Sequence, residues 1–296
     1  MLVGSIRVQP KEAVVDLTPP GQLVVVATPI GNLGDLSPRA LEVLTSADVV
    51  YCEDTRRSRI LYSAHGVTPR APLRSLHEHN EHDRCAAVIA HIRAGQLVAL
   101  VSDAGTPGIS DPGERVVAAV ADAGLAVTTA PGPSAVVTAL SISGLSSERF
   151  IMEGFLPRKG AERQRRLESW AHEARTVVFY ESPQRLAATL SELAERWPLR
   201  RVVVARELTK LHEELVRGTL ESVAARYHDS ETQGELVVVL EGVLDERVID
   251  DEEILRALDH AFDEGSSTRD AVDEVAQALG VARRHVYQLA LGRPVD

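Results

Sequence analysis

The 296-residue sequence contains only two cysteines, Cys52 and Cys85, which are too few for a disulfide framework or a cysteine zinc site. It also lacks any apolar run near the roughly 20 residues that a membrane-spanning helix needs. Its first residues show no basic segment followed by an apolar one, so no secretory signal is expected. These absences favour a soluble protein in the reducing cytoplasm.

The signatures of several common catalytic and nucleotide-binding sites are also absent. No strand is followed by G-x-G-x-x-G, and neither G-x-x-x-x-G-K-[ST] nor G-x-S-x-G occurs. His77-Glu78-His79 resembles a metal cluster, but its histidines are two residues apart and would diverge on a helix. We therefore predict no metal site and interpret this segment as a polar loop that faces a substrate.

Positive charge is in deficit, with 32 Lys and Arg against 43 Asp and Glu, for a net charge of -11. One stretch, residues 245–264, has nine acids and two arginines and supplies -7 of this total. Residues 156–166 have five bases and one acid, and residues 56–84 have six arginines and three acids, net +4 and +3. Solvated loops explain a single charged run, but two basic segments in an acidic chain indicate a local anionic partner.

Apolar runs and helical spacings alternate along the chain. We expect residues 1–21 to be a disordered leader that ends in turn-forming residues. The strands expected next are 23–30, 48–54, 97–105 and 126–134, with helices beginning at Ser37-Pro38 and spanning 81–94 and 115–124. This alternation predicts a parallel sheet. A second α/β block has expected strands at 176–182, 200–209 and 234–242, with a helix after the first.

The chain then ends in a short helical segment. Residues 267–292 show two helical spacings joined at Gly280, the pattern of a helix-turn-helix. The side chains expected to face inward are Ala271, Val275, Ala276, Leu279, Val281, Val286, Leu289 and Ala290. The predicted domains are 22–133, 134–244 and an acidic connector with helices over 245–296.

Three loops at the carboxyl ends of the predicted strands are rich in Gly, Pro, Asp and Ser: residues 28–35, 102–113 and 130–134. Such loops build the ligand site of a parallel sheet. Asp103 could accept hydrogen bonds from a cationic or hydroxylated ligand, although the same loop could be a turn closed by Asp111-Pro112. Ser134 could cap the following helix, or its backbone amide could bind a ligand carboxylate.

Eight segments in this order closely resemble one family: ATPIGNLGDLSPRA, CEDTRRS, LVSDAGTPGISDPG, APGPSA, GFLPRKG, FYESPQR, ARELTKLHEE and GELVVVLEG. They resemble the ribosomal RNA small subunit methyltransferase I family, the 16S rRNA cytidine 2′-O-ribose methyltransferases of the tetrapyrrole methylase superfamily. The resemblance covers about residues 22–291. It implies a two-domain α/β fold with S-adenosylmethionine in the interdomain cleft, plus the C-terminal helix-turn-helix-like appendage.

The resemblance also implies site residues and partners. The expected substrate is a cytidine in the decoding region of 16S rRNA within the small ribosomal subunit, and the expected assembly is a homodimer without membrane contact. The residues that would contact S-adenosylmethionine are Pro29, Asp103, Gly105, Ile109, Ser134, Ala135, Tyr180 (or its neighbour Phe179) and Leu208. The residues that would contact the RNA substrate are Asn32, Arg56, Asn80, Glu81, Arg158 and Lys159.

Attack of a ribose hydroxyl on a methyl group needs positioning and benefits from a general base. Glu53 and Asp54 are the candidate bases, although Asp54 could instead form an ion pair with Arg56 or Arg57. Two other functions stay open at this point. One is methylation of a tetrapyrrole or another small molecule, which would need neither basic loops nor the C-terminal helices. The other is DNA recognition by the C-terminal helical pair, opposed by the acidic stretch before it.

Overall fold

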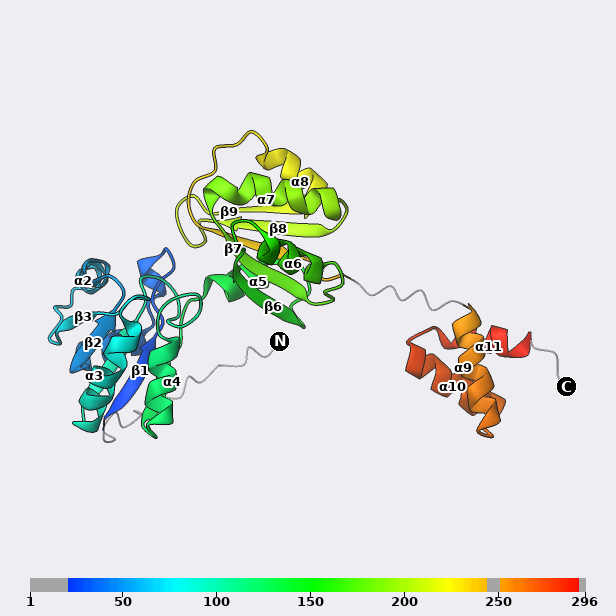
Figure 1. Ribbon diagram of the computed structural model, residues 1–296, viewed down its shortest axis with the longest axis horizontal. Helices are drawn as coiled ribbons and strands as arrows, with labels where there is room; N and C mark the ends of the chain where they lie inside the picture. Colours follow the sequence, from blue (N-terminus) through cyan, green and yellow to red (C-terminus); the bar gives the residue numbers. More distant parts are fainter. Residues whose placement is uncertain (1–20, 244–250, 293–296) are drawn as a thin grey trace, which may run out of the picture. The chain divides into compact units, whose positions relative to one another are not determined.

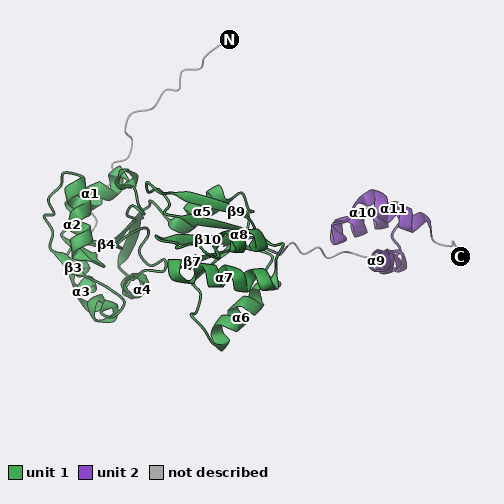
Figure 2. Ribbon diagram, turned by 90° about the horizontal axis from the view of Figure 1, so that it is seen from above, with its two compact units in different colours: residues 1–242 green, residues 243–296 purple. Residues whose placement is uncertain are grey.

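The computed structural model describes residues 21–243 and 251–292, so residues 1–20 of the predicted leader lie outside the described part. The chain divides into two compact units, residues 1–242 and 243–296, coloured separately in Figure 2. The first unit contains two five-stranded sheets with helices on both faces (Figure 1). In the described ranges, no helix is long and apolar enough to cross a membrane.

The first sheet is entirely parallel and has the order β3-β2-β4-β1-β5. Its strands are β1 (Gln22–Val26), β2 (Val49–Cys52), β3 (Leu73–Ser75), β4 (Leu97–Val101) and β5 (Ala126–Ala130). The predicted parallel sheet is therefore confirmed. Strands β1, β4 and β5 end earlier than the sequence suggested, because the Pro- and Gly-containing segments after them leave the ladder.

Helices cover both faces of this sheet because side chains on a strand alternate between its faces. Val24, Val50 and Ala99 pack with helices α1 and α2, whereas Leu23 and Val98 pack with α3 and α4. The helices are α1 (Pro38–Ser46), α2 (Thr55–Ala64), α3 (Glu81–Arg93) and α4 (Glu114–Asp122), and a 3₁₀ turn, η1 (Leu33–Asp35), follows β1. The Ser37 side chain caps α1 as predicted, accepting a hydrogen bond from the Ala40 amide.

The second sheet is mixed, with the order β6-β7-β10-β8-β9. Among its paired neighbours only β6 and β7 are parallel, whereas β10 is antiparallel to both β7 and β8, and β9 is antiparallel to β8. The strands are β6 (Phe150–Phe155), β7 (Thr176–Glu181), β8 (Arg201–Arg206), β9 (Glu214–Thr219) and β10 (Leu236–Leu240). The sequence patterns predicted β7, β8 and β10 but not β6 or β9.

Four helices cover the second sheet. Helix α5 packs on one face through Val136, Ala139 and Leu140, and the other three pack on the opposite face around the buried Trp170. They are α5 (Ala135–Ser143), α6 (Ala161–Trp170), α7 (Pro183–Arg196) and α8 (Leu220–Tyr227). Because α5 follows β5 directly in the chain but packs on the second sheet, the segment between them joins the two α/β halves.

The second unit contains three helices around its own small core. They are α9 (Asp251–Asp263), α10 (Thr268–Leu279) and α11 (Arg283–Leu291). All eight side chains predicted to face inward belong to this core or pack against it. Part of the acidic connector expected within residues 245–296 is instead helix α9, because Ile254, Leu258 and Ala261 form a buried apolar stripe while the acidic side chains lie on the other faces.

Candidate functional site

The three glycine- and proline-containing loops meet because their strands are neighbours in the first sheet. Strand β1 lies between β4 and β5, so the segments after these strands leave the sheet at one edge. Backbone hydrogen bonds join Thr28 to Gly105 in both directions, at 2.8 and 3.1 Å. The Thr106 hydroxyl donates to the Pro133 carbonyl at 3.2 Å. The loop after β4 is thus held between the other two.

The second sheet contributes the ends of β7 and β8 and the beginning of β10. These three points coincide because β10 is antiparallel to its neighbours, which sets Leu236 opposite both Glu181 and Arg206. Residues that follow β7 and β8 therefore lie beside residues that precede β10. This edge faces the loops of the first sheet.

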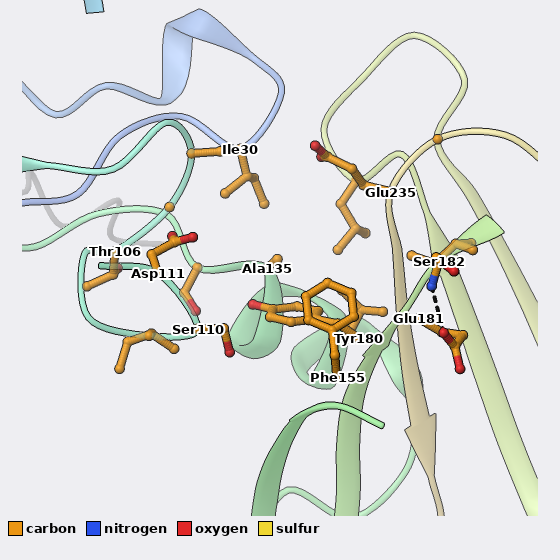
Figure 3. A pocket seen from close by; sticks show the side chains of 18 of the residues that line it. Ile30, Thr106, Ser110, Asp111, Ala135, Phe155, Tyr180, Glu181, Ser182 and Glu235 are labelled. Carbon is orange, nitrogen blue, oxygen red and sulfur yellow. Dashed lines mark hydrogen bonds between the residues drawn. The ribbon is translucent and has the colours of Figure 1, made fainter. Parts of the chain in front are cut away.

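A cavity of about 350 Å³ lies between these two groups of loops (Figure 3). This volume is in the range of small-molecule sites. Ile30, Thr106, Ser110 and Asp111 lie on one side of it, and Phe155, Tyr180 and Glu235 lie on the other. The lining also contains Ala104, Gly105, Ile109, Ser134, Ala135, Glu181, Ser182, Pro183, Leu208, Gly234, Leu236 and Val237. The surface is largely apolar, with a few polar groups at fixed places.

Six of the eight residues expected at the cofactor line this cavity: Gly105, Ile109, Ser134, Ala135, Tyr180 and Leu208. The alternative to Tyr180, Phe179, is fully buried in the core of the second sheet. The remaining two expected residues, Pro29 and Asp103, line a separate hollow of about 170 Å³ beside α2. The structure thus brings most of this predicted set together and separates Pro29 and Asp103 from it.

The Asp103 carboxylate is occupied by groups at the start of α2. One oxygen accepts the Asp54 amide at 2.9 Å, and the other lies 3.5 Å from Nε of Arg57. The Asp103 amide in turn lies 3.4 Å from a carboxylate oxygen of Glu53. These contacts join the loop after β4 to the loop after β2, so Asp103 fixes the positions of the two loops relative to each other.

The Asp54 carboxylate caps α2 and forms an ion pair with Arg56. It accepts the Arg56 amide at 2.7 Å and a guanidinium nitrogen at 2.8 Å. The Arg56 side-chain and backbone hydrogen bonds lower the pKa of Asp54 to about 2. A carboxylate with such a low pKa is a weak proton acceptor, so these contacts favour the ion-pair alternative over the general base.

Two of the residues expected at the substrate hold local turns. The Asn32 side-chain oxygen accepts the Gly34 amide at 3.0 Å, and the backbone amide of Asn32 donates to the Thr209 hydroxyl in the loop after β8 at 3.0 Å. The Asn80 side chain accepts the His77 amide at 2.9 Å and donates to the Ser75 carbonyl at 3.3 Å. Asn32 stays exposed beside the joined loops, whereas both polar ends of Asn80 are occupied.

Glu81 is only 5% exposed, although the resemblance implied a substrate contact. One of its oxygens accepts the amides of Gly113, Arg115 and Val116 at 2.9, 2.9 and 3.3 Å. Gly113 has no side chain to cap α4, so Glu81 performs this function from α3. The structure therefore gives Glu81 a structural role and leaves it no surface for a substrate.

Arg158 and Lys159 are exposed in the segment between β6 and α6. Two hydrogen bonds fix the backbone at the start of this segment. Arg185 donates to the Leu156 carbonyl at 2.8 Å, and Arg163 donates to the Pro157 carbonyl at 3.1 Å. The backbone is thus held while the two charged side chains face solvent.

Asp111 lines the cavity, and sequence reasoning treated it only as a turn residue. Burial, the nearby Glu53 carboxylate and, to a lesser extent, Asp103 raise its pKa to about 6, although a hydrogen bond from Ser102 opposes the shift. Burial and the two neighbouring carboxylates all disfavour the ionised form of Asp111. The cavity therefore holds a carboxyl group that changes charge near neutral pH.

We expect Asp111→Asn to stabilise the protein above pH 6. The pKa of Asp111 is higher in the folded state than the usual 3.8. The protonated carboxyl group therefore makes its full contribution to the free energy of unfolding below pH 3.8, and this contribution is lost as the pH rises through about 6. The neutral asparagine avoids this loss. Thermal unfolding would show a melting temperature a few degrees above wild type at pH 8 and a difference that vanishes near pH 4. Asp122→Asn, at an exposed position of α4, is the control, and a difference independent of pH would contradict the prediction.

Other lining residues had no clear signal in the sequence. Ser182 and Pro183 follow the carboxyl end of β7, where ligand-binding residues of such a sheet are expected. Gly234 to Val237, in contrast, lie at the start of β10. Only the antiparallel direction of β10 brings them to the cavity. Phe155 ends β6, which the sequence patterns did not predict.

The His77-Glu78-His79 segment forms a turn before α3. The two imidazole rings contact each other edge to face, with centroids 6.0 Å apart. Within residues 21–243 and 251–292, no group of three or more His, Cys, Asp or Glu side chains is arranged to hold a metal ion.

Comparison with known proteins gives similarities over nearly all of the chain. Residues 22–224 match the family model of Tetrapyrrole (Corrin/Porphyrin) Methylases, and residues 248–293 match the RsmI C-terminal HTH domain. The chain is 44% identical to Ribosomal RNA small subunit methyltransferase I of Synechocystis sp., over 93% of this chain and 99% of that protein. It is 45% identical to the protein of the same name from Mycobacterium tuberculosis, over 92% and 95%.

The fold is also similar to that of solved structures. One is uroporphyrin-III C-methyltransferase from Thermus thermophilus, in complex with S-adenosylhomocysteine, with a TM-score of 0.51 and 21% identity. That match covers 75% of this chain and 97% of the Thermus chain. At this identity the likeness concerns the fold.

Proposed function

Because the chain belongs to the tetrapyrrole methylase family and, within it, to the ribosomal RNA small subunit methyltransferase I family, we propose that it methylates 16S rRNA with S-adenosylmethionine. The proposed acceptor is the 2′-hydroxyl of a cytidine ribose in the decoding region of the small ribosomal subunit. The proposed enzyme is a cytoplasmic homodimer.

One observation carries the choice of RNA over a small molecule. The similarity to the rRNA methyltransferases extends through the C-terminal helical unit, whereas the Thermus uroporphyrin enzyme covers three quarters of the chain. A macrocycle small enough to enter a cleft needs no additional helical unit. The exposed Arg158 and Lys159 beside the cavity residue Phe155 also suit a phosphate backbone.

The cavity residues fit S-adenosylmethionine. Ile30, Leu208 and Val237 offer apolar surface for the adenosine, and the loop at Gly105, with a φ of +81°, lets the backbone approach a ligand closely. Bound there, the cofactor would supply a methyl group activated by a sulfonium. The sulfonium loses its positive charge during transfer, so a largely apolar lining favours the reaction more than a cluster of carboxylates around the sulfur would.

The protein would contribute positioning and a proton acceptor. Asp54 is a poor acceptor because its pKa is about 2. Asp111 lies in the cavity wall, and a pKa of about 6 suits an acceptor near neutral pH. Asp111 is therefore the favoured base in this proposal, and Glu53 acts beside it by raising its pKa.

Recognition of DNA by the second unit is a less favoured alternative. The first turn of α11 contains Arg283, Arg284 and His285, as in a recognition helix. However, Arg283 forms an ion pair with Asp273, and His285 lies 2.7 Å from Asp251. These acidic partners reduce the positive charge available to a phosphate backbone.

The test is methylation of purified small ribosomal subunits followed by alkaline cleavage of the 16S rRNA. A 2′-O-methyl group removes the nucleophile for strand scission, so we expect one missing band in the cleavage ladder. A tetrapyrrole precursor incubated in parallel with labelled cofactor is the comparison. Label transferred to RNA with a complete ladder would reject the ribose target, and label transferred only to the tetrapyrrole would reject the RNA substrate.

A further inference from the structure

Phe155 is an exposed aromatic residue at the edge of the cavity. It lines the cavity, yet its side chain is 58% exposed. Two of the chain's four phenylalanines are exposed in this way, the other being Phe150 at the opposite end of β6. Exposed aromatic surface at the rim of a ligand site is available for a binding partner.

The ring of Phe155 is supported on one side and open on the other. It contacts the Tyr180 ring, with centroids 5.4 Å apart and an angle of 47° between the planes (Figure 3). Tyr180 is itself fixed, because it packs against the core between the second sheet and α5. Phe155 is therefore held against a rigid neighbour, as a stacking platform requires.

The chain after Phe155 is fixed in the same way. Leu156 is 2% exposed, and the hydrogen bonds from Arg163 and Arg185 hold the next carbonyl groups. The exposed Arg158 and Lys159 follow within three and four residues, so their backbone lies at most about 14 Å from that of Phe155. An apolar platform and two cations are thus presented together on a preorganised segment.

This combination fits an RNA nucleotide better than the cofactor. S-adenosylmethionine has no phosphate, and its sulfonium and ammonium outweigh its single carboxylate, so two neighbouring cations suit it less well than they suit a phosphate backbone. A nucleotide within RNA has a base with a flat face and a phosphate on either side. Proteins that bind single-stranded RNA use aromatic side chains for bases and Arg or Lys for phosphates.

We propose that Phe155 is the stacking platform for the base of the target nucleotide, with Arg158 and Lys159 contacting the adjacent phosphates. This subsite rests on the proposed RNA substrate and deepens it. A stacked base outside its helix would bring the attached ribose to the cavity where the methyl group is held. Because an aromatic face accepts any base, this contact favours an unpaired nucleotide more than a particular base.

The experiment compares Phe155→Ala, Phe155→Leu and Phe155→Trp on small ribosomal subunits, with Phe150→Ala as the matched control on the same strand. Loss of stacking changes binding by about 5- to 150-fold, so we expect Phe155→Ala to lower kcat/KM for the subunits by about 10- to 100-fold. Phe155→Trp should stay near wild type and Phe155→Leu near the alanine variant. Because Phe155 also lines the cavity, calorimetry with S-adenosylmethionine is the parallel readout, and the change in its Kd should be much smaller than the change in kcat/KM for the subunits.

The outcomes distinguish this subsite from the proposed function. If the wild-type protein methylates no RNA, both fail. If the wild type is active and Phe155→Ala retains its kcat/KM, only the stacking subsite fails. A leucine variant as active as tryptophan would replace stacking by simple apolar contact, and a cofactor Kd weakened as much as kcat/KM would assign Phe155 to the adenine. Either result would overturn the proposal, as would an equal loss in Phe150→Ala.

Discussion

Replacing Ala135 with phenylalanine is expected to weaken the binding of S-adenosylmethionine by at least about 100-fold, or about 2.7 kcal/mol. Ala135 is the first residue of α5 and its side chain lines the cavity. An aromatic ring at this position would fill space that the ligand needs, while the sheets behind it stay intact. Calorimetric titration with the cofactor measures the effect.

Two further variants make this test specific. Val137→Phe places the same ring two residues along α5, where the side chain is 58% exposed and outside the cavity. It should bind the cofactor like wild type. Asp103→Ala should also retain binding within about threefold, because Asp103 contacts the start of α2 and not the cavity. Wild-type affinity in Ala135→Phe, or loss of binding in Asp103→Ala, would show that the ligand lies in the smaller hollow.

The second large effect is expected from Glu81→Ala, which removes the cap of α4. The alanine variant leaves three backbone amides at the start of α4 without their acceptor, two of them buried. Loss of a buried carboxylate with such hydrogen bonds costs about 3 to 5 kcal/mol. In a domain of this size the melting temperature should fall by about 10 °C.

Glu78→Ala is the matched control, since Glu78 is exposed three residues earlier in the chain. Its melting temperature should stay within about 1 °C of wild type. Glu81→Gln keeps one acceptor oxygen without the charge and should give an intermediate value. A Glu81→Ala protein with a wild-type melting temperature but no RNA methylation would instead support the substrate contact that the resemblance implied.

The comparison of Glu81 with Asp111 shows where sequence reasoning loses information. Glu81 begins the helix expected over 81–94 and Asp111 lies in the loop after β4, but nothing in their neighbours along the chain shows which carboxylate another helix will cover. In the structure, α3 brings Glu81 under α4, whereas the loop after β4 turns Asp111 into the cavity wall. One carboxylate thus stabilises a helix and the other remains available to a ligand.

The sequence alone determined the parallel first sheet, the three loops at its carboxyl edge and the helical pair near the C-terminus. These features follow from local patterns: β-branched runs, helix caps and the spacing of apolar side chains. The order of eight motifs also identified the family. Each pattern and each single motif lies in a short segment, so no distant contact is needed to recognise it.

Only the tertiary structure decided which loop residues share a cavity. Gly234 to Val237 reach it because β10 runs antiparallel to β7 and β8, and Phe155 reaches it at the end of a strand without a clear pattern. Asp103 does not line the cavity, because its carboxylate binds the Asp54 amide and the Arg57 guanidinium instead. Strand direction and competition for hydrogen-bond partners are set by residues far apart in the chain, which is why local patterns do not contain them.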